Sequence, residues 1–210
     1  MNQKFYLAPS KILQGDFNPQ DLNLMLVFQV NCPGCFMHGF PFASHAHKKF
    51  GPQGLKVMAL STAFEDYELN TLDNTKLLLE DGILIGETKK TLNANGYDEL
   101  PYPIEFPIGF DNLQPMKGQE LTAEAVDKMC ETLPEYEQLN FTEKKLVRAQ
   151  VKEYLLNKKF SAATFDANDL RGTPSWILYD KDYFIYGKWF GQQSHKEMEE
   201  KIKKLLEIEE

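Results

Sequence analysis

The sequence lacks long hydrophobic runs, clustered positive charge and a cysteine framework. No stretch of its 210 residues approaches the roughly 18 consecutive apolar residues of a membrane-spanning helix. It has 23 Lys and Arg against 31 Asp and Glu, which gives a net charge of −8. Nucleic acids and anionic membranes attract clustered cations, so we expect neither as a partner. The short lysine-containing runs at 48–49 and 201–204 are typical of solvated helix faces.

A secretory signal is also missing. Residues 1–14 include Lys4 and Lys11 but lack an apolar stretch of the length that such signals need. We therefore expect a cytoplasmic protein. A chain whose export signal had been removed would have the same sequence.

The three cysteines are too few for a disulfide framework. Cys32 and Cys35 are three positions apart, whereas Cys130 stands alone within a helical pattern. In a reducing compartment, a close pair is more often catalytic or metal-binding than structural. Cys130 fits the role of a small buried hydrophobic side chain.

The sequence does contain enough apolar material for a sizeable core, since 42% of its residues are hydrophobic, including 15 Phe and 9 Tyr. Apolar runs predict strands at 24–30, 55–61, 104–110, 175–179 and 183–190. Pro107 assigns the third of these strands to a sheet edge or a bulge. Asp180–Asp182 is typical of the turn of a hairpin between the last two.

Helical patterns separate these strands. The spacing of apolar residues and the end signals predict helices at 33–50, 72–80, 123–133, about 143–155 and 195–206. Asn70 or Thr71 would cap the second helix, and Ser194 with Glu197 would form a capping box on the last one. The stretch 87–103 has no strong pattern. We expect the segment at about 112–168 to be a helical insert within one domain spanning residues 1–210.

The main chemical signal is the motif Cys32-Pro33-Gly34-Cys35, which follows a buried strand and opens a helix. The first helical turn has unpaired N–H groups and the positive end of the helix dipole, so a thiolate there is stabilised. Cys32 lies at the exposed turn, and Cys35 lies one turn later on the same side. Cys32 could therefore attack a disulfide and Cys35 could resolve the mixed disulfide. Gly34 would let a substrate approach the sulfurs closely.

A metal site is one alternative, because zinc sites also use paired cysteines. His38, His45 and His47 follow the motif, and Cys35 and His38 could share a helix face. A second cysteine pair or a histidine pair at ligand spacing is missing. Surface or packing roles therefore fit each histidine better, and we predict no metal.

A second signal lies far along the chain, where Arg171-Gly172-Thr173-Pro174 leads directly into the strand Ser175–Tyr179. A proline just before an interior strand indicates a special turn, for which a cis peptide bond is one option. An ordinary proline at the entry of a strand is the other option.

Together these features resemble the thioredoxin-fold superfamily, and within it the TlpA-like and AhpC-TSA (redoxin) group of thiol–disulfide oxidoreductases. The resemblance covers about residues 20–62, 102–111 and 170–207. It implies an α/β fold, a thioredoxin-like three-layer α/β/α sandwich with a mixed central sheet. It also implies that Pro174 is cis beside the cysteines, and that Thr173 presents its backbone to a bound substrate.

The resemblance implies a protein or small-molecule disulfide as substrate, and an electron donor that the sequence does not identify. No cofactor is expected beyond the Cys32–Cys35 disulfide. We expect catalysis by Cys32 and Cys35, with substrate bound at Pro33, Gly34, Thr173 and Pro174. Trp176 and Phe36 could line the site or belong to the core.

Several residues depart from the family pattern. Asn31 stands where the family often has Trp, and Leu26 stands where thioredoxins carry a buried acid. Two other functions also stay open. One is a peroxiredoxin-like peroxidase, with antioxidant activity, in which Cys35 attacks peroxide. The other is a non-enzymatic metal-binding or redox-sensing module whose insert contacts a partner.

Overall fold

The computed structural model describes residues 3–116, 122–133, 135–191 and 195–208. Contacts divide the chain into two compact units. Unit 1 comprises Met1–Leu113 and Ala162–Glu210, and unit 2 comprises Gln114–Ser161. The insert predicted at 112–168 includes all of unit 2, and the assignment of the whole chain to a single domain stays a prediction.

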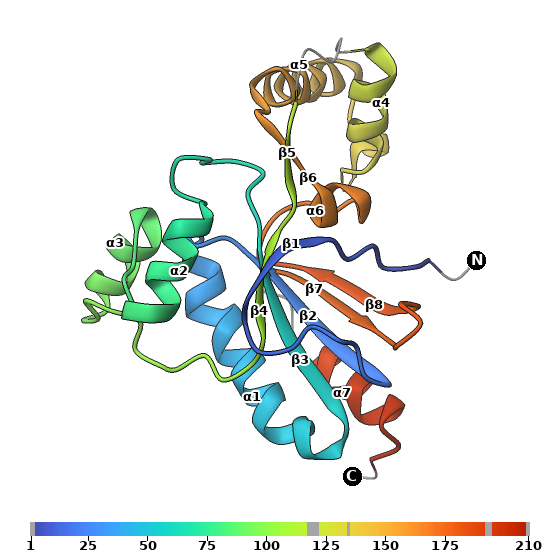
Figure 1. Ribbon diagram of the computed structural model, residues 1–210. Coiled ribbons are helices and arrows are strands. Elements are labelled where there is room, and N and C mark those ends of the chain that lie inside the picture. The colour runs from blue at the N-terminus through green and yellow to red at the C-terminus, as the bar shows by residue number, and fades with distance from the viewer. Residues whose placement is uncertain (1–2, 117–121, 134, 192–194, 209–210) are drawn as a thin grey trace. The chain divides into compact units, whose positions relative to one another are not determined.

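A six-stranded sheet forms the centre of unit 1 (Figure 1). Its strands are β1 (Pro9–Gln14), β2 (Leu22–Phe28), β3 (Leu55–Ser61), β4 (Ile108–Asp111), β7 (Ser175–Tyr179) and β8 (Ile185–Phe190). Their order across the sheet is β1-β4-β3-β2-β7-β8. Because β2 pairs in parallel with β3 and antiparallel with β7, the sheet is mixed, as predicted. β2 and β7 are buried throughout, which explains their unbroken apolar sequences.

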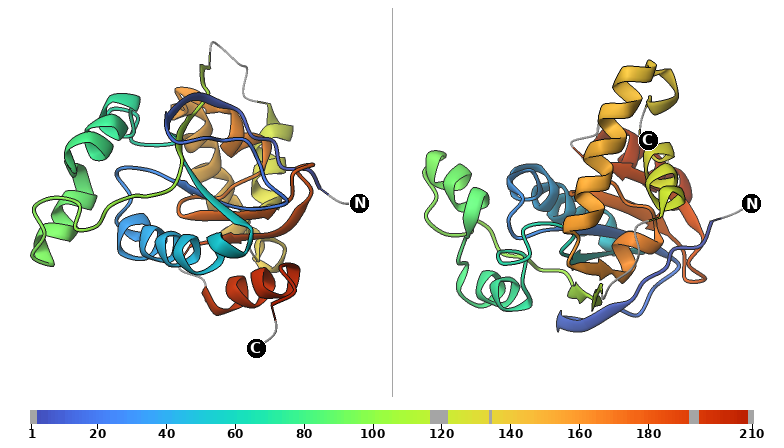
Figure 2. Two further views of the ribbon diagram at one scale, coloured as in Figure 1. Left: turned by 60° about the horizontal axis from the view of Figure 1, so that its bottom comes forward. Right: turned by 90° about the horizontal axis from the view of Figure 1, so that it is seen from above.

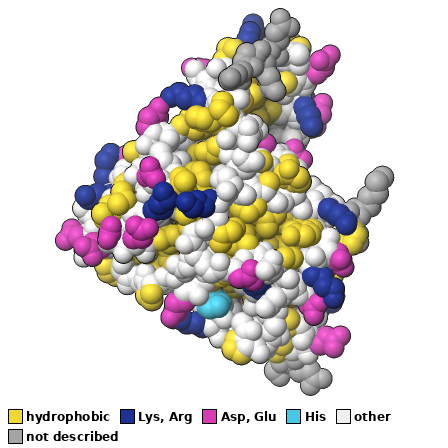
Figure 3. All heavy atoms as spheres, viewed as in Figure 1, with side chains coloured by type: hydrophobic (Ala, Val, Ile, Leu, Met, Phe, Trp, Pro, Cys, Tyr) yellow, Lys and Arg dark blue, Asp and Glu magenta, His cyan; other side chains and the backbone are white. Residues whose placement is uncertain are grey.

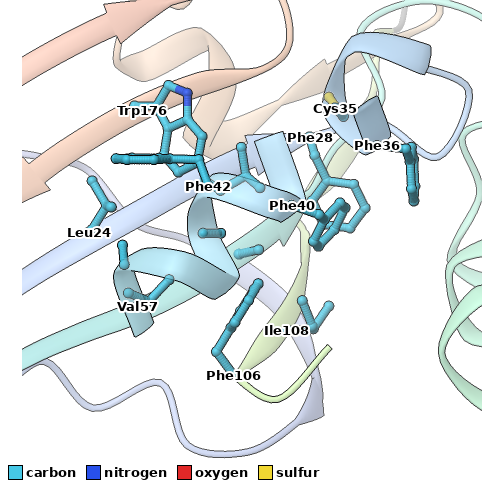
Figure 4. Close-up of a cluster of buried hydrophobic side chains, with 14 of the residues drawn as sticks. Leu24, Phe28, Cys35, Phe36, Phe40, Phe42, Val57, Phe106, Ile108 and Trp176 are labelled. Carbon is cyan, nitrogen blue, oxygen red and sulfur yellow. The ribbon is translucent and has the colours of Figure 1, made fainter. Parts of the chain in front are cut away.

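One face of this sheet is covered by helices α1 (Phe40–Phe50) and α7 (His195–Leu205), which lie side by side in Figure 2. Met198 and Ile202 of α7 are fully buried there, as their spacing predicted. Ser194, the predicted cap of α7, lies outside the described residues. The core on this face consists largely of aromatic and aliphatic side chains, which Figure 4 shows around Phe28, Phe40, Phe42, Phe106 and Trp176.

The other face of the sheet is covered by a thinner layer. It comprises the N-terminal segment around Phe5 and Leu7 and the short helix α6 (Ala163–Ala167), which contributes Phe165. Met25, Val27 and the other alternate residues of the central strands point to this side. The sheet therefore lies between two unequal layers.

Two further helices pack at the margin of the first face, namely α2 (Leu72–Asp81) and α3 (Gly86–Ala94). Thr71 caps α2 by accepting a hydrogen bond from the backbone N–H of Asn74 (3.1 Å), and Gly82 ends it with a φ of +68°. Helix α3 was not predicted, because only Thr88 and Leu92 of its residues are buried and the apolar pattern is weak.

Pro107 was predicted to mark a sheet edge or a bulge, and the edge is wrong. The pairing of β1 with β4 does contain a register shift between Ile12 and Gln14, next to Ile108. β4 begins one residue after Pro107 and lies between β1 and β3, so it is an interior strand. The proline contributes only its carbonyl, which accepts the backbone N–H of Ala59 (2.8 Å), and its missing N–H is not needed. β1, which was not predicted, forms the edge instead.

Unit 2 has its own small core. Its helices are α4 (Ala123–Glu131) and α5 (Phe141–Asn157), with the single 3₁₀ turn η3 (Tyr136–Gln138) between them. The core side chains are Val126, Cys130, Tyr136 and Val151. Asn140 and Glu143 form a capping box at the start of α5. A two-stranded ladder of β5 (Leu113–Pro115) and β6 (Phe160–Ala162) connects this unit to the sheet domain.

Charged side chains of both signs are interspersed over the face drawn in Figure 3. Many basic side chains pair with acidic ones, as Lys49 does with Glu199 (2.8 Å) and Lys56 with Asp16 (2.9 Å). Within the described part of the chain, no helix combines the length and the apolar character that crossing a bilayer requires.

Candidate active site

The chain enters the candidate site from the carboxyl end of β2. Pro33 and Gly34 begin the helix, a π-helical turn η1 (Cys35–Gly39) follows, and α1 continues it. Single π turns occur frequently at functional sites. The backbone N–H of Cys35 donates to the carbonyl of Cys32 (3.0 Å), which closes the turn and folds the two cysteines toward each other.

The two thiols are free and lie 2.9 Å apart. The Cys35 side chain is completely buried at the start of the helix, against the aromatic core (Figure 4), whereas Cys32 is partly exposed. A substrate can therefore reach the Cys32 sulfur, and only Cys32 itself can reach the Cys35 sulfur without a rearrangement of the turn.

Electrostatics separate the two thiols further. The hydrogen bond from Cys35 lowers the pKa of Cys32 to about 7, with help from Thr173 and the backbone N–H groups of Gly34 and Cys35 and against the effect of burial. Burial raises the pKa of the Cys35 thiol, and so does the neighbouring Cys32. Near pH 7, roughly half of Cys32 is therefore thiolate, whereas Cys35 stays a thiol.

The Thr173–Pro174 turn lies directly against this pair. Its peptide bond is cis, and the Cys32 thiol donates to the backbone oxygen of Thr173 (3.4 Å). Pro174 also lies close to the helix, since a Cβ placed on Gly39 would be 3.5 Å from the Cβ of Pro174. The structure thus brings together all six predicted residues, Cys32, Pro33, Gly34, Cys35, Thr173 and Pro174.

Two residues that the sequence left open are part of the core. Trp176 and Phe36 have at most 1% of their surface exposed, so neither lines an accessible site. The exposed aromatic beside the turn is Phe190, whose ring lies 2.7 Å from a Cβ placed on Gly172. Any larger residue at Gly172 would displace this ring.

Three neighbours of the cysteines were not predicted. Gln29 accepts a hydrogen bond from the Thr173 hydroxyl (3.3 Å) and contributes a backbone hydrogen bond to Cys35. Tyr102 donates to the carbonyl of Phe36 (2.6 Å), and its pKa is raised by burial and by Cys35. Asn31 binds two other segments, the loop 65–70 and the start of α3, and was noted only as a departure from the family. Gln29 and Tyr102 give no sequence signal, because their contacts come from distant parts of the chain.

Leu26, which stands where thioredoxins carry a buried acid, belongs to the apolar core. Leu26 is completely buried, and its methyl groups lie 3.5–3.6 Å from a Cβ placed on Gly39. No carboxylate therefore occupies the position behind Cys35 where thioredoxins carry one. Among the residues that the structure describes, no group of three or more His, Cys, Asp or Glu side chains could hold a metal ion.

Solved structures with a similar fold exist. A thiol–disulfide isomerase from Corynebacterium glutamicum is 20% identical over 98% of this chain and 96% of its own, with a TM-score of 0.59. A thioredoxin-like superfamily protein is 22% identical over 97% and 96%, with a TM-score of 0.56. A thioredoxin-like protein in its oxidized form is 15% identical over 100% and 98%, with a TM-score of 0.53.

The fold is thioredoxin-like. The predicted fold class is thereby confirmed, with the CPGC motif at the start of the helix that follows β2. No family model matches the sequence, and no curated protein matches it. At identities of 15–22%, the three likenesses show the thioredoxin-like fold alone.

Proposed function

We propose that this protein is a thiol–disulfide oxidoreductase in which Cys32 is the attacking cysteine and Cys35 the resolving one. The observation that carries the proposal is the pair of free sulfurs 2.9 Å apart, one accessible and one buried. The low pKa of Cys32, about 7, supports the same division of roles, because the thiolate is the nucleophile in disulfide exchange.

The reaction has two exchange steps. In the first, the Cys32 thiolate attacks one sulfur of a substrate disulfide, forms a mixed disulfide and releases the other sulfur as a thiolate, which takes a proton from solvent. In the second, Cys35 loses its proton, attacks the Cys32 sulfur and releases the remaining substrate thiol. The substrate gains two electrons, and the protein ends as the Cys32–Cys35 disulfide.

The second step starts from a thiol whose pKa is raised by burial and by Cys32. Once Cys32 is in the mixed disulfide, it carries no negative charge, so that contribution disappears and the Cys35 proton leaves more readily. Because Leu26 replaces the family's buried acid, water that enters with the substrate is the acceptor we propose for this proton.

The geometry favours this function over a peroxidase. A peroxidatic Cys35 would need an accessible thiolate, and here Cys35 is fully buried with a raised pKa. The accessible low-pKa thiol is Cys32, and peroxide chemistry at Cys35 would require the turn to open. Exchange with a disulfide needs no such change.

We further propose that Pro33, Gly34, Thr173 and Pro174 contact the substrate, which is a protein or small-molecule disulfide. The chain needs no cofactor besides its own disulfide, and a separate dithiol donor returns it to the reduced form. A place in the TlpA-like redoxin group belongs to the same proposal, on the CPGC motif and the Thr173-Pro174 turn, and so does a cytoplasmic location.

A redox equilibrium tests the proposal. The purified protein is equilibrated with reduced and oxidized glutathione, and the peptide that holds Cys32 and Cys35 is analysed by alkylation and mass spectrometry. We expect a reversible disulfide with a potential in the range of known oxidoreductases, roughly −120 to −270 mV. If no Cys32–Cys35 disulfide forms, or bound zinc prevents alkylation, exchange chemistry is excluded and a binding module takes its place.

A further inference from the structure

Asn31 lies between the buried strand β2 and Cys32, and every polar group of its side chain has a partner. Its amide nitrogen donates to the Asp66 carboxylate (2.8 Å). Its amide oxygen accepts the backbone N–H of Glu87 (2.7 Å). These partners are 35 and 56 residues away in the sequence, so one side chain connects three separate segments.

The contact with Glu87 caps helix α3. Its N-cap residue, Ile85, has no side-chain acceptor for the first free N–H groups of the helix. Asn31 supplies that acceptor from another part of the fold. Gly86 shows how close the approach is, because a Cβ on Gly86 would lie 2.0 Å from the Asn31 amide oxygen. Only glycine leaves room at this position for the Asn31 side chain.

The backbone of Asn31 is fixed as well. Its N–H donates to the side-chain oxygen of Asn70 (3.0 Å), and the Asn70 amide donates to the carbonyl of Glu65 (3.0 Å). Asn70 has 1% of its surface exposed, so this hydrogen bond is shielded from water. Both the main chain and the side chain of Asn31 are thus held by the loop 65–70.

We propose that Asn31 is a positioning residue that anchors the CPGC turn to the loop 65–70 and to the start of α3, and so holds Cys32 at its hydrogen-bond donors. Cys32 is the next residue. Its thiolate is stabilised by the Cys35 thiol, by the Thr173 side chain and by the backbone N–H groups of Cys35 and Gly34, so it depends on the alignment of these donors. This inference deepens the proposed function and rests on it.

The first test is the variant Asn31→Ala. With the anchor removed, the donors around Cys32 lose their alignment and the Cys32 pKa rises. We expect a rise of about one unit, which is a tenfold loss of thiolate at pH values below the pKa. The readout is the rate of Cys32 alkylation by iodoacetamide as a function of pH, measured by mass spectrometry. With a disulfide substrate, kcat should fall while KM is unchanged, because in this proposal Asn31 acts through Cys32 and not on the substrate.

A second variant, Gly86→Ala, disturbs the Asn31 side chain without replacing it. In Gly86→Ala, the new methyl group displaces the Asn31 amide, so we expect the same rise in the Cys32 pKa. In the double variant Asn31→Ala/Gly86→Ala, the obstructed oxygen is gone, and the pKa should equal that of Asn31→Ala alone. Gly96→Ala is the matched control. Gly96 also has a positive φ, +88°, but nothing lies within 4 Å of its Cβ position.

The outcomes separate cleanly. The inference is overturned if Asn31→Ala leaves the Cys32 pKa unchanged, if Gly86→Ala behaves like Gly96→Ala, or if the two changes add in the double variant. If Asn31→Ala does not fold, the Gly86→Ala comparison decides alone. Failure of wild-type Cys32 and Cys35 to exchange disulfides would overturn the proposed function instead, while the alkylation profile would still measure the anchor.

Discussion

Two cysteines of the same motif have opposite properties because they occupy different surroundings. Cys32 lies outside the helix, next to backbone donors and Thr173, which favour its charged form. Cys35 lies one turn inside, against Phe28 and Phe36 in the apolar core (Figure 4), which favours its neutral form. Spacing predicted the pair, and the difference in burial supports the roles that we propose for the two cysteines.

Replacing each cysteine separately tests these roles. We expect Cys32→Ser to abolish disulfide reduction, because the accessible nucleophile is gone. We expect Cys35→Ser to accumulate mixed disulfides at Cys32, since the first exchange step still occurs and the second cannot. Intact-mass analysis of each variant after incubation with a disulfide substrate distinguishes the two. Cys130→Ala is the control and should retain full activity. Substantial activity in Cys32→Ser would reverse the assignment.

The pH dependence of the reaction follows from the Cys32 thiolate. Because its pKa is lowered to about 7, kcat/KM should be independent of pH well above 7 and should fall below it. Under those acid conditions, the fall is about tenfold per pH unit, in proportion to the thiolate fraction. A profile of kcat/KM with an inflection near 9, the ordinary value for a thiol, would show that the donors around Cys32 do not act.

At the scale of elements, the sequence predicted correctly the strands that are buried on both faces, because their apolar runs are unbroken. β3 and β7 begin and end where their apolar runs do, and α2 begins directly after Thr71, one of its two predicted caps. β1 and α3 were missed, because each buries only part of one side and shows no clear period. The edge predicted from Pro107 is not found, because the proline lies just before β4 and not within it.

The candidate site could be predicted only as far as its motifs reach. CPGC and the Thr-Pro turn carry local signals, and the structure brings them together. Gln29, Tyr102 and Asn31 act through partners 35 to 144 residues away, and no local pattern announces such contacts. Tertiary hydrogen bonds of this kind become visible only in the folded chain.

The buried carboxylate of Asp111 holds the start of helix α6. The Asp111 carboxylate accepts hydrogen bonds from the N–H groups of Thr164 (2.9 Å) and Phe165 (3.2 Å) and from the Thr62 hydroxyl (2.9 Å). Asp111 is fully buried, and burial raises its pKa despite these donors. The start of α6 and the end of β3 are thus joined through a single side chain.

We therefore expect Asp111→Ala to lower the free energy of unfolding by about 3 kcal/mol, because it leaves these buried donors without a partner. Urea denaturation followed by circular dichroism measures the change. Asp16→Ala is the control: the Asp16 side chain is exposed and pairs with Lys56 (2.9 Å), so its removal should cost clearly less stability than the loss of Asp111. If both variants lost the same free energy of unfolding, the burial of Asp111 would not explain its contribution to stability.

At the scale of the whole molecule, unit 2 is inserted in the chain between the two segments of unit 1. β5 and β6 pair with each other, and the N–H of Met116 donates to the carbonyl of Lys159 (3.0 Å). The two ends of the insert therefore lie next to each other. Its hydrophobic core is separate from the two cores of unit 1.

Deletion of residues 116–159, with a short Gly-Ser turn in their place, should leave unit 1 folded. All six candidate site residues belong to unit 1. We expect the glutathione redox equilibrium of Cys32 and Cys35 to be unchanged, because no residue of their described hydrogen-bond network is removed. Reaction with a protein disulfide is the comparison to make next: a loss there alone would give unit 2 a role in substrate choice. A changed potential would contradict the independence of the site.

The buried thiol of Cys130 can report on local opening of unit 2. Its thiol has no exposed surface, so a reagent can reach it only when α4 and α5 separate. Cys32 is open to the same reagent in the closed protein. In a single labelling experiment, the rate of alkylation at Cys130 therefore measures how often the insert opens. The rate of alkylation at Cys32 is the internal standard, and no added probe is needed.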